Sequence, residues 1–200
     1  MANLFDDIKE TVEGRDLSLR WYQARIRALG GRQMQGPAAG LKMIREGKDR
    51  GRISNRPTYG MLNLFRYFPE EPTKMPYYDI FPLVLPLRRK RDGFVGINFH
   101  FLPLPLRVKV LNRLMEGFGD EAAEKLDVAY GMLKANRFIR PALRRYKREA
   151  VSSYYLQVPL EDMLIGILLP VARFFKGPYE KRQVVHPNAV WRRTRRLVNA

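Results

Sequence analysis

The stretch that decides the fold is "DIFPLVLPLRRKRDGFVGINFHFLP", which runs from Asp79 to Pro103. An Asp-Gly pair between two apolar arms is a strong signal for a two-residue β-hairpin turn, in this chain at Asp92-Gly93. Residues 94–100, which follow the pair, predict a short strand. The hairpin accounts for the Asp-Gly pair. It does not account for four consecutive cations at its tip, Arg88, Arg89, Lys90 and Arg91.

The arm before the tip, residues 80–87, predicts a second strand. Pro82 and Pro86 lie within it, and proline cannot donate a hydrogen bond to a neighbouring strand. We therefore expect this strand to be irregular or to lie at the edge of its sheet.

Apolar periodicity and turn residues outside the hairpin predict further helices and strands. The best helix begins at Pro103 to Pro105, with two adjoining apolar rows that contain Leu106, Val110 and Leu114 and then Leu111, Met115 and Phe118. The other predicted helices are 15–31, 37–46, one from Asp120, 161–169 and a short one in 188–200; the other predicted strands are 61–68 and 152–158. Together these elements predict an α+β fold, a small antiparallel sheet packed with helices.

The chain has 200 residues and a net charge of +17, from 37 Lys and Arg against 20 Asp and Glu. Such an excess implies a polyanionic partner, which could be nucleic acid, an acidic membrane surface or an acidic protein. The chain has no cysteine, which excludes a disulfide framework and a thiolate metal site. The acidic start at Phe5-Asp6-Asp7 does not resemble a signal peptide. The longest apolar run, 163–172, is about half of the roughly 20 residues that span a bilayer, so we expect no membrane association.

The basic residues are concentrated in blocks at 15–57, 136–150 and 173–200, besides the hairpin tip. We divide the chain accordingly into a basic helical or extended N-terminal region (1–57), an α+β core (58–175) and a basic C-terminal tail (176–200). Each block alone is equally consistent with a solvated, self-repelling face. All of them on one compact body would repel one another unless a polyanion offset the charge.

Catalytic motifs are absent from the sequence. The two histidines, His100 and His186, have no spaced carboxylate pair beside them, and there is no phosphate-binding glycine loop, zincin pattern or nucleophile elbow. We expect His100 to be a structural residue held by a hydrogen bond at a strand end, and Asp79 to cap a turn. The sequence therefore predicts a protein that is not an enzyme and that needs neither a metal nor a cofactor.

Three blocks of the sequence together resemble a family of tailed-bacteriophage virion proteins that is described as the DNA end protector of contractile-tailed phages. The blocks are "WYQARIRALGGR", "RPTYGMLNLFRYFPEEPTKMPYYDIFPLVLPL" and "DGFVGINFHFLPLPLRVKVLNRLM". The resemblance covers roughly residues 20–175, and its most specific parts are Pro76-Tyr77-Tyr78-Asp79 and the pair Asn98 and His100. It implies a virion protein that lies near the end of the packaged genome, and it supplies no catalytic residue.

The resemblance and the basic blocks lead to one hypothesis, which is binding to the end of double-stranded DNA through phosphates, without reading bases. Tyr22, Tyr146 and Trp191 would stack on an unpaired terminal base or, as we expect for each of them, pack in the core. The candidate nucleic-acid-binding residues are Arg88, Arg89, Lys90, Arg91, Arg140, Arg144, Arg145, Arg192, Arg193, Arg195 and Arg196.

Two alternatives remain open at this point. One is a purely structural phage neck or baseplate component whose basic blocks meet acidic faces of neighbouring subunits. The other is a host-type RNA-binding protein. For the first hypothesis the expected partners are the DNA end and other virion proteins of the portal, neck or tail, in a ring assembly where an oligomer would fit. The expected location is the virion, and the host cytoplasm during assembly.

Overall fold

The computed structural model describes residues 39–48, 51–115, 130–131, 133–136, 139–159, 162–169 and 172–199. Antiparallel sheets packed with helices confirm the predicted α+β class. The predicted helix over 15–31 lies outside the described residues, as does Tyr22. Most of the helix predicted from Asp120 also lies outside them.

The larger sheet has six antiparallel strands in the order β1-β7-β2-β4-β5-β6. The longest pair, β4 and β5, is the predicted hairpin, and β6 adds to its outer side along most of β5. The strands are β1 (Ile53–Ser54), β2 (Leu62–Leu64), β4 (Leu83–Lys90), β5 (Gly93–Asn98), β6 (Leu143–Lys147) and β7 (Tyr155–Val158).

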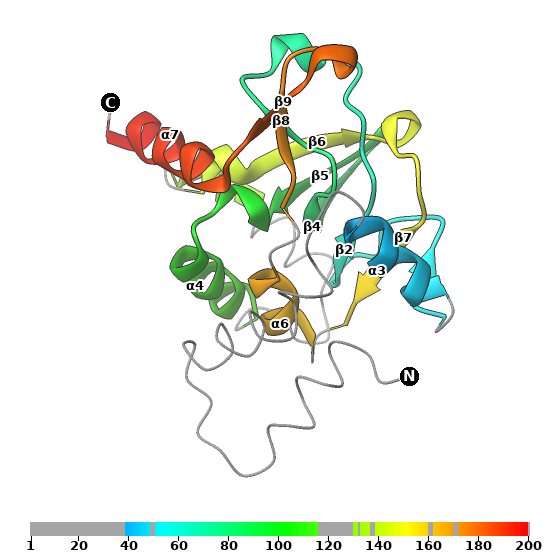
Figure 1. Cartoon of the computed structure of the whole chain (residues 1–200). Helices are drawn as coiled ribbons and strands as arrows, with labels where there is room; N and C mark the ends of the chain where they lie inside the picture. The colour runs from blue at the N-terminus through cyan, green and yellow to red at the C-terminus, as the bar shows by residue number, and fades with distance from the viewer. Residues whose placement is uncertain are drawn as a thin grey trace.

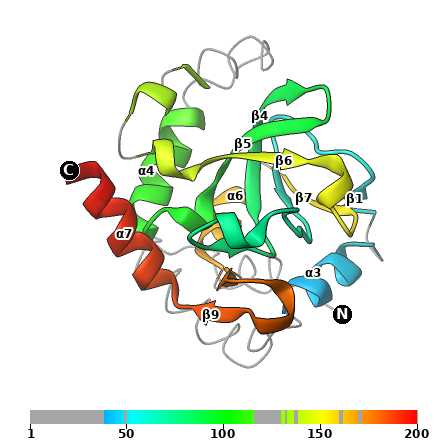
Figure 2. The same ribbon diagram turned by 90° about the horizontal axis from the view of Figure 1, so that it is seen from above.

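A second, smaller sheet holds β3 (Tyr78–Asp79), β8 (Phe174–Lys176) and β9 (Gln183–Val185) in the order β3-β8-β9. In Figure 1, β8 and β9 lie above the hairpin strands, and the helices α4 (Leu104–Met115) and α6 (Met163–Leu168) lie below. The C-terminal helix α7 (Pro187–Asn199) projects from one side of the body, as Figure 2 also shows.

Both faces of the central part of the six-stranded sheet are buried, and successive side chains of a strand enter two different clusters. Leu83 and Leu85 of β4 belong to the large hydrophobic cluster, which also contains the apolar residues of α6. Val84, between them, belongs to a second cluster of mostly aromatic residues. That second cluster consists of Phe65, Tyr67, Val84, Phe94, Tyr146, Ala150 and Tyr155.

The apolar stripe predicted for α4 is confirmed at four positions, whereas Phe118 and the side chain of Met115 lie outside the described part of the chain. Val110, Leu111 and Leu114 are buried in the large cluster and Leu106 packs against it, whereas Lys109 is exposed. The helix lies against α6, which is short and almost wholly buried. The predicted helix over 37–46 appears as α3 (Ala39–Lys48), which packs on β7.

The hairpin turn lies one residue earlier than the sequence predicts. Lys90 pairs with Gly93, so Arg91 and Asp92 form the loop and Gly93 is the first residue of β5. Gly93 is required for another reason, because it lies close to the neighbouring strand. A Cβ atom at this position would lie 1.9 Å from the carbonyl oxygen of Tyr146 in β6.

The prediction of an irregular or edge strand before the tip is confirmed as an irregular strand, because the register with β5 shifts within β4, but its first residues do not lie at an edge. Leu83 and Val84 pair with β2 on one side, and Val84 also pairs with Asn98 of β5 on the other. Pro86 is tolerated because β2 ends before reaching it and because the register with β5 shifts between Pro86 and Arg88. Short neighbours and a register shift thus accommodate a residue that cannot donate.

The strand predicted over 61–68 is shorter in the structure, where β2 ends at Leu64 and Tyr67 makes an isolated bridge to Val151. The sequence patterns predicted no strand for the residues of β6, β8 and β9. Within the region predicted as 1–57, the described elements α3 and β1 both contact β7. Within the described segments no helix is both long and apolar enough to cross a bilayer.

Candidate functional site

The hairpin tip carries the largest run of consecutive exposed cations. Arg88, Arg89, Lys90 and Arg91 are all exposed. The Arg88 guanidinium carbon lies 5.8 Å from the centre of the Tyr130 ring, and that of Arg89 lies 5.0 Å from the centre of the Tyr59 ring. Since Arg88 and Arg89 are neighbours in a strand, they point to opposite faces, and the tip presents positive charge on both sides.

The adjacent edge strand β6 is also basic, but two of its cations are engaged by carboxylates. Arg145 Nη2 donates to Asp92 Oδ2 at 2.6 Å, which joins β6 to the hairpin loop. This hydrogen bond lowers the pKa of Asp92. Lys147 pairs with Glu70 and lies 3.7 Å from Glu149. The charge of Arg145 is therefore partly offset within the protein before any polyanion approaches.

Arg144, the neighbour of Arg145, is half-buried and points to the other face of β6. Its guanidinium carbon lies 4.2 Å from the centre of the Phe101 ring. Its Nε is buried and has no hydrogen-bond partner among the described residues. Burial lowers the pKa of Arg144. Arg140, in the short helix η3 (Arg140–Ala142) just before β6, is exposed.

Helix α7 is held to the core by its apolar side. Val190 is buried, and Trp191 Nε1 donates to the carbonyl oxygen of His100 at 2.9 Å. Arg192 and Arg193 are exposed, and the Arg193 guanidinium carbon lies 5.9 Å from the centre of the Tyr77 ring. Arg195 and Arg196 belong to the same helix, but their side chains are outside the described part of the chain.

The structure thus brings some predicted residues together and separates others. Arg144 and Arg193 lie on the neighbouring rings of Phe101 and Tyr77. The four cations of the tip are separate from them, at the C-terminal end of β4. Of the residues considered for base stacking, Tyr146 is buried and stacks on Phe94, with 5.3 Å between ring centres. Core packing is therefore confirmed for Tyr146.

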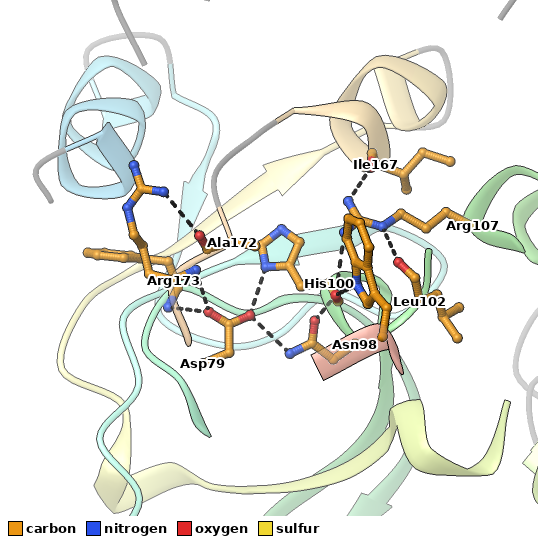
Figure 3. Close-up of polar contacts among 10 residues, drawn as sticks. Asp79, Asn98, His100, Leu102, Arg107, Ile167, Ala172 and Arg173 are labelled. Atoms are coloured by element: carbon orange, nitrogen blue, oxygen red, sulfur yellow. Dashed lines mark hydrogen bonds and ion pairs between the residues drawn. The ribbon is translucent and has the colours of Figure 1, made fainter. Parts of the chain in front are cut away.

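A buried polar cluster centred on Asp79 of β3 joins this strand to Asn98 of β5 and to His100 (Figure 3). Asp79 Oδ1 accepts hydrogen bonds from the backbone N–H of Phe81 at 3.0 Å and of Arg173 at 3.3 Å. Asp79 Oδ2 accepts from His100 Nδ1 at 2.7 Å and from Asn98 Nδ2 at 3.2 Å. The turn-capping role predicted for Asp79 is confirmed, and so is the hydrogen bond predicted for His100.

His100 lies in the short helix η2 (Phe99–Phe101), directly after β5, and its side chain is fully buried. Asn98 caps η2 by accepting the backbone N–H of His100 at 2.9 Å. Burial lowers the pKa of His100 although Asp79 acts in the opposite direction, and the nearby Arg107 and Arg173 lower it further. Neutral His100 therefore donates through Nδ1, and its Nε2 has no partner among the described residues.

Arg107, on α4, is a second buried charge beside this cluster. It donates to the carbonyl oxygens of Leu102 at 2.8 Å and Ile167 at 2.7 Å, and more weakly to that of His100 at 3.4 Å. Burial lowers the pKa of Arg107 to about 9, which leaves it cationic at neutral pH. Arg107 thereby ties α4 and α6 to η2.

The buried cluster is suited to holding elements together, because neither ring nitrogen of His100 reaches solvent. Within the described residues, no group of three His, Cys, Asp or Glu side chains is placed to hold a metal ion. Sequence reasoning missed the pairing of Asp79 with His100 and the burial of Arg107. The signal available was a polar residue inside an otherwise apolar stretch, as at Asp79 in "YYDIF" and at Asn98 and His100 in "INFHF".

Comparison with known proteins adds no relative, since no family model, curated protein or solved structure matches the chain.

Proposed function

We propose that this protein is a non-enzymatic phage virion protein that binds the end of the packaged double-stranded DNA genome near the portal and neck and protects it from nucleases. The observation that carries the proposal is the hairpin tip, where Arg88, Arg89, Lys90 and Arg91 project together from the end of β4 and β5. The net charge of +17 and the sequence resemblance point in the same direction.

The form of the tip suits contacts with phosphates. A hairpin turn with cations on both faces can approach a DNA backbone without a groove-reading helix. Arginine binds phosphate through two parallel hydrogen bonds, and each phosphate neutralised releases condensed counterions. Such contacts carry no sequence information, and a protein that must hold the end of a genome needs none.

The test compares binding to a blunt linear duplex with binding to a covalently closed circle of equal length, at several salt concentrations. The proposal expects tighter binding to the linear form, with slower digestion by an exonuclease. Digestion of the circle by an endonuclease should be unaffected.

Two results would contradict the proposal in different ways. Equal affinity for the linear duplex and the circle would show a general DNA-binding protein. An absence of DNA binding at physiological salt would favour the structural neck or baseplate component that meets acidic faces of neighbouring subunits.

A further inference from the structure

Two arginines from different elements lie on one group of aromatic rings. Tyr77 and Phe101 have their ring centres 5.8 Å apart, and Phe174 lies 5.0 Å from Phe101 and 6.2 Å from Tyr77. Arg144 reaches Phe101 from β6, and Arg193 reaches Tyr77 from α7. The contacts of η2 with α7 and η3 bring the two elements to this place. An aromatic face holds a guanidinium flat and leaves its N–H edges for a ligand.

Neither Arg144 nor Arg193 forms an ion pair with a carboxylate among the described residues, in contrast to Arg145, which pairs with Asp92. Arg144 is partly desolvated, and its buried Nε has no partner. Its two terminal nitrogens make no hydrogen bond with the described residues and are not buried. A desolvated cation such as Arg144 destabilises the fold unless an anion offsets its charge.

We propose that Arg144 and Arg193, on the floor of Tyr77 and Phe101, bind the 5′-terminal phosphate of a DNA strand. This inference rests on the proposed function and assigns the strand end itself to a site separate from the hairpin tip. The Tyr77 hydroxyl makes no hydrogen bond with the rest of the described chain and is not buried, so it is available as a further donor.

Burial and charge favour a terminal phosphate over one inside a strand. Arg144 is half-buried, whereas the tip cations are exposed. A continuous backbone meets projecting side chains most easily, and a recessed guanidinium is reached most easily by a chain end. A phosphate monoester also carries about −1.5 to −2 charges at neutral pH, which offsets two arginines better than the single charge of a phosphodiester.

The experiment separates the terminal phosphate from the duplex. Binding is measured for a thymidine dinucleotide and for a blunt duplex, each with a 5′-phosphate and with a 5′-hydroxyl. The proteins are the wild type, Arg144→Gln, Arg193→Gln and the control Arg182→Gln. Arg182 is matched because its guanidinium carbon also lies over an aromatic ring, 4.9 Å from the centre of Phe175.

The wild type and Arg182→Gln should bind each phosphorylated ligand about tenfold more tightly than its hydroxyl form, as expected for a charge-assisted hydrogen bond. Arg144→Gln and Arg193→Gln should each lose most of that preference. If Arg144→Gln proves less stable than the wild type, the Arg193→Gln variant still tests the proposal, because Arg193 is exposed and its replacement should not affect folding.

Equal binding of the two dinucleotides by the wild type would overturn the terminal-phosphate site, even if the duplex were held by the tip. A retained dinucleotide preference with no preference for linear over circular duplex would support the site. That second result would contradict the proposed end protection instead.

Discussion

The carboxylate of Asp79 and the imidazole of His100 form a buried hydrogen bond of 2.7 Å across 21 residues of sequence. The same carboxylate accepts the N–H of Arg173, next to β8, and the amide of Asn98, at the end of β5. Asp79 thus joins the small sheet to the large one. The carbonyl oxygen of His100 in η2 also accepts hydrogen bonds from Arg107 of α4 and Trp191 of α7, so these helices hold η2 as well.

Replacement of Asp79 by alanine should lower the free energy of unfolding by about 3–5 kcal/mol. The change leaves a buried histidine, an amide and two backbone N–H groups without their acceptor, and each orphaned buried group costs about 1–3 kcal/mol. Urea denaturation monitored by circular dichroism measures the effect. Glu71→Ala is the matched control, since Glu71 pairs with Lys74 on the surface and its loss should cost less than about 1 kcal/mol. Equal effects of the two changes would contradict the role of Asp79 as the link between the sheets.

The stability of the protein should fall as the pH falls below about 6.5. Burial lowers the pKa of His100 in the folded state, so the unfolded chain binds a proton that the folded chain resists. The stabilisation is complete above the ordinary pKa of histidine and is lost toward the lowered folded value, with a slope of up to about 1.4 kcal/mol per pH unit. Denaturation at a series of pH values between about 5 and 7.5 measures this slope.

The variant His100→Gln should have a flatter stability profile in that window, although it is less stable at neutral pH. His186→Gln removes a surface imidazole and should keep the wild-type profile. A wild-type profile that rises as the pH falls below the ordinary pKa of histidine would show that Asp79 outweighs burial. Such a profile would contradict a lowered pKa of His100.

Gly93→Ala should destabilise the protein by about 1–3 kcal/mol, because its methyl group would overlap the Tyr146 carbonyl oxygen and push β6 away from β5. Gly131→Ala is the opposite control. Gly131 is helical, a Cβ there meets nothing within 4 Å, and alanine should stabilise the helix by about 0.5–1 kcal/mol. Thermal or urea unfolding of both variants measures the difference, and a neutral Gly93→Ala would mean that β5 and β6 are less closely paired.

The sequence predicted those parts of the fold that depend on local pattern. Apolar periodicity, together with residues that begin or end a helix, predicts the apolar stripe of α4 and the helices α3 and α7. The position of β4 inside the sheet was not predicted. The argument from proline considers one strand without its neighbours, whereas Pro86 is tolerated because β2 is short and the register with β5 shifts. The turn was misplaced by one residue because the demand on Gly93 comes from β6, which is distant in sequence.

The candidate sites also differ in whether local sequence or contacts between distant segments define them. Four consecutive cations identify the tip directly, but the partners of Asp79, Arg107 and Arg144 come from segments far away in the chain. Strand β6, "LRRYK", was not recognised since three of its five residues are cations, and only tertiary contacts explain them. Arg144 lies over Phe101 and Arg145 pairs with Asp92, so neighbouring arginines have different roles.

Neutralisation of the tip, as Arg88→Gln, Arg89→Gln, Lys90→Gln and Arg91→Gln together, should flatten the dependence of duplex affinity on salt. Four phosphates neutralised by the tip would reduce the slope of log affinity against log salt by roughly 3–4 units. The measurement is duplex binding across a salt series for the variant and the wild type. The matched control neutralises four exposed cations scattered elsewhere, Lys74, Arg148, Lys176 and Lys181.

The alternative role for the tip is protection of the hairpin against edge-to-edge aggregation, which charged residues also provide. The two roles differ in what the variant loses. A phosphate-binding tip loses salt dependence while the protein stays soluble, and the scattered variant changes the slope much less. A protective tip would leave the slope unchanged and make the variant aggregate. An unchanged slope in a soluble, folded variant would count against DNA contact at the tip and in favour of a structural neck protein.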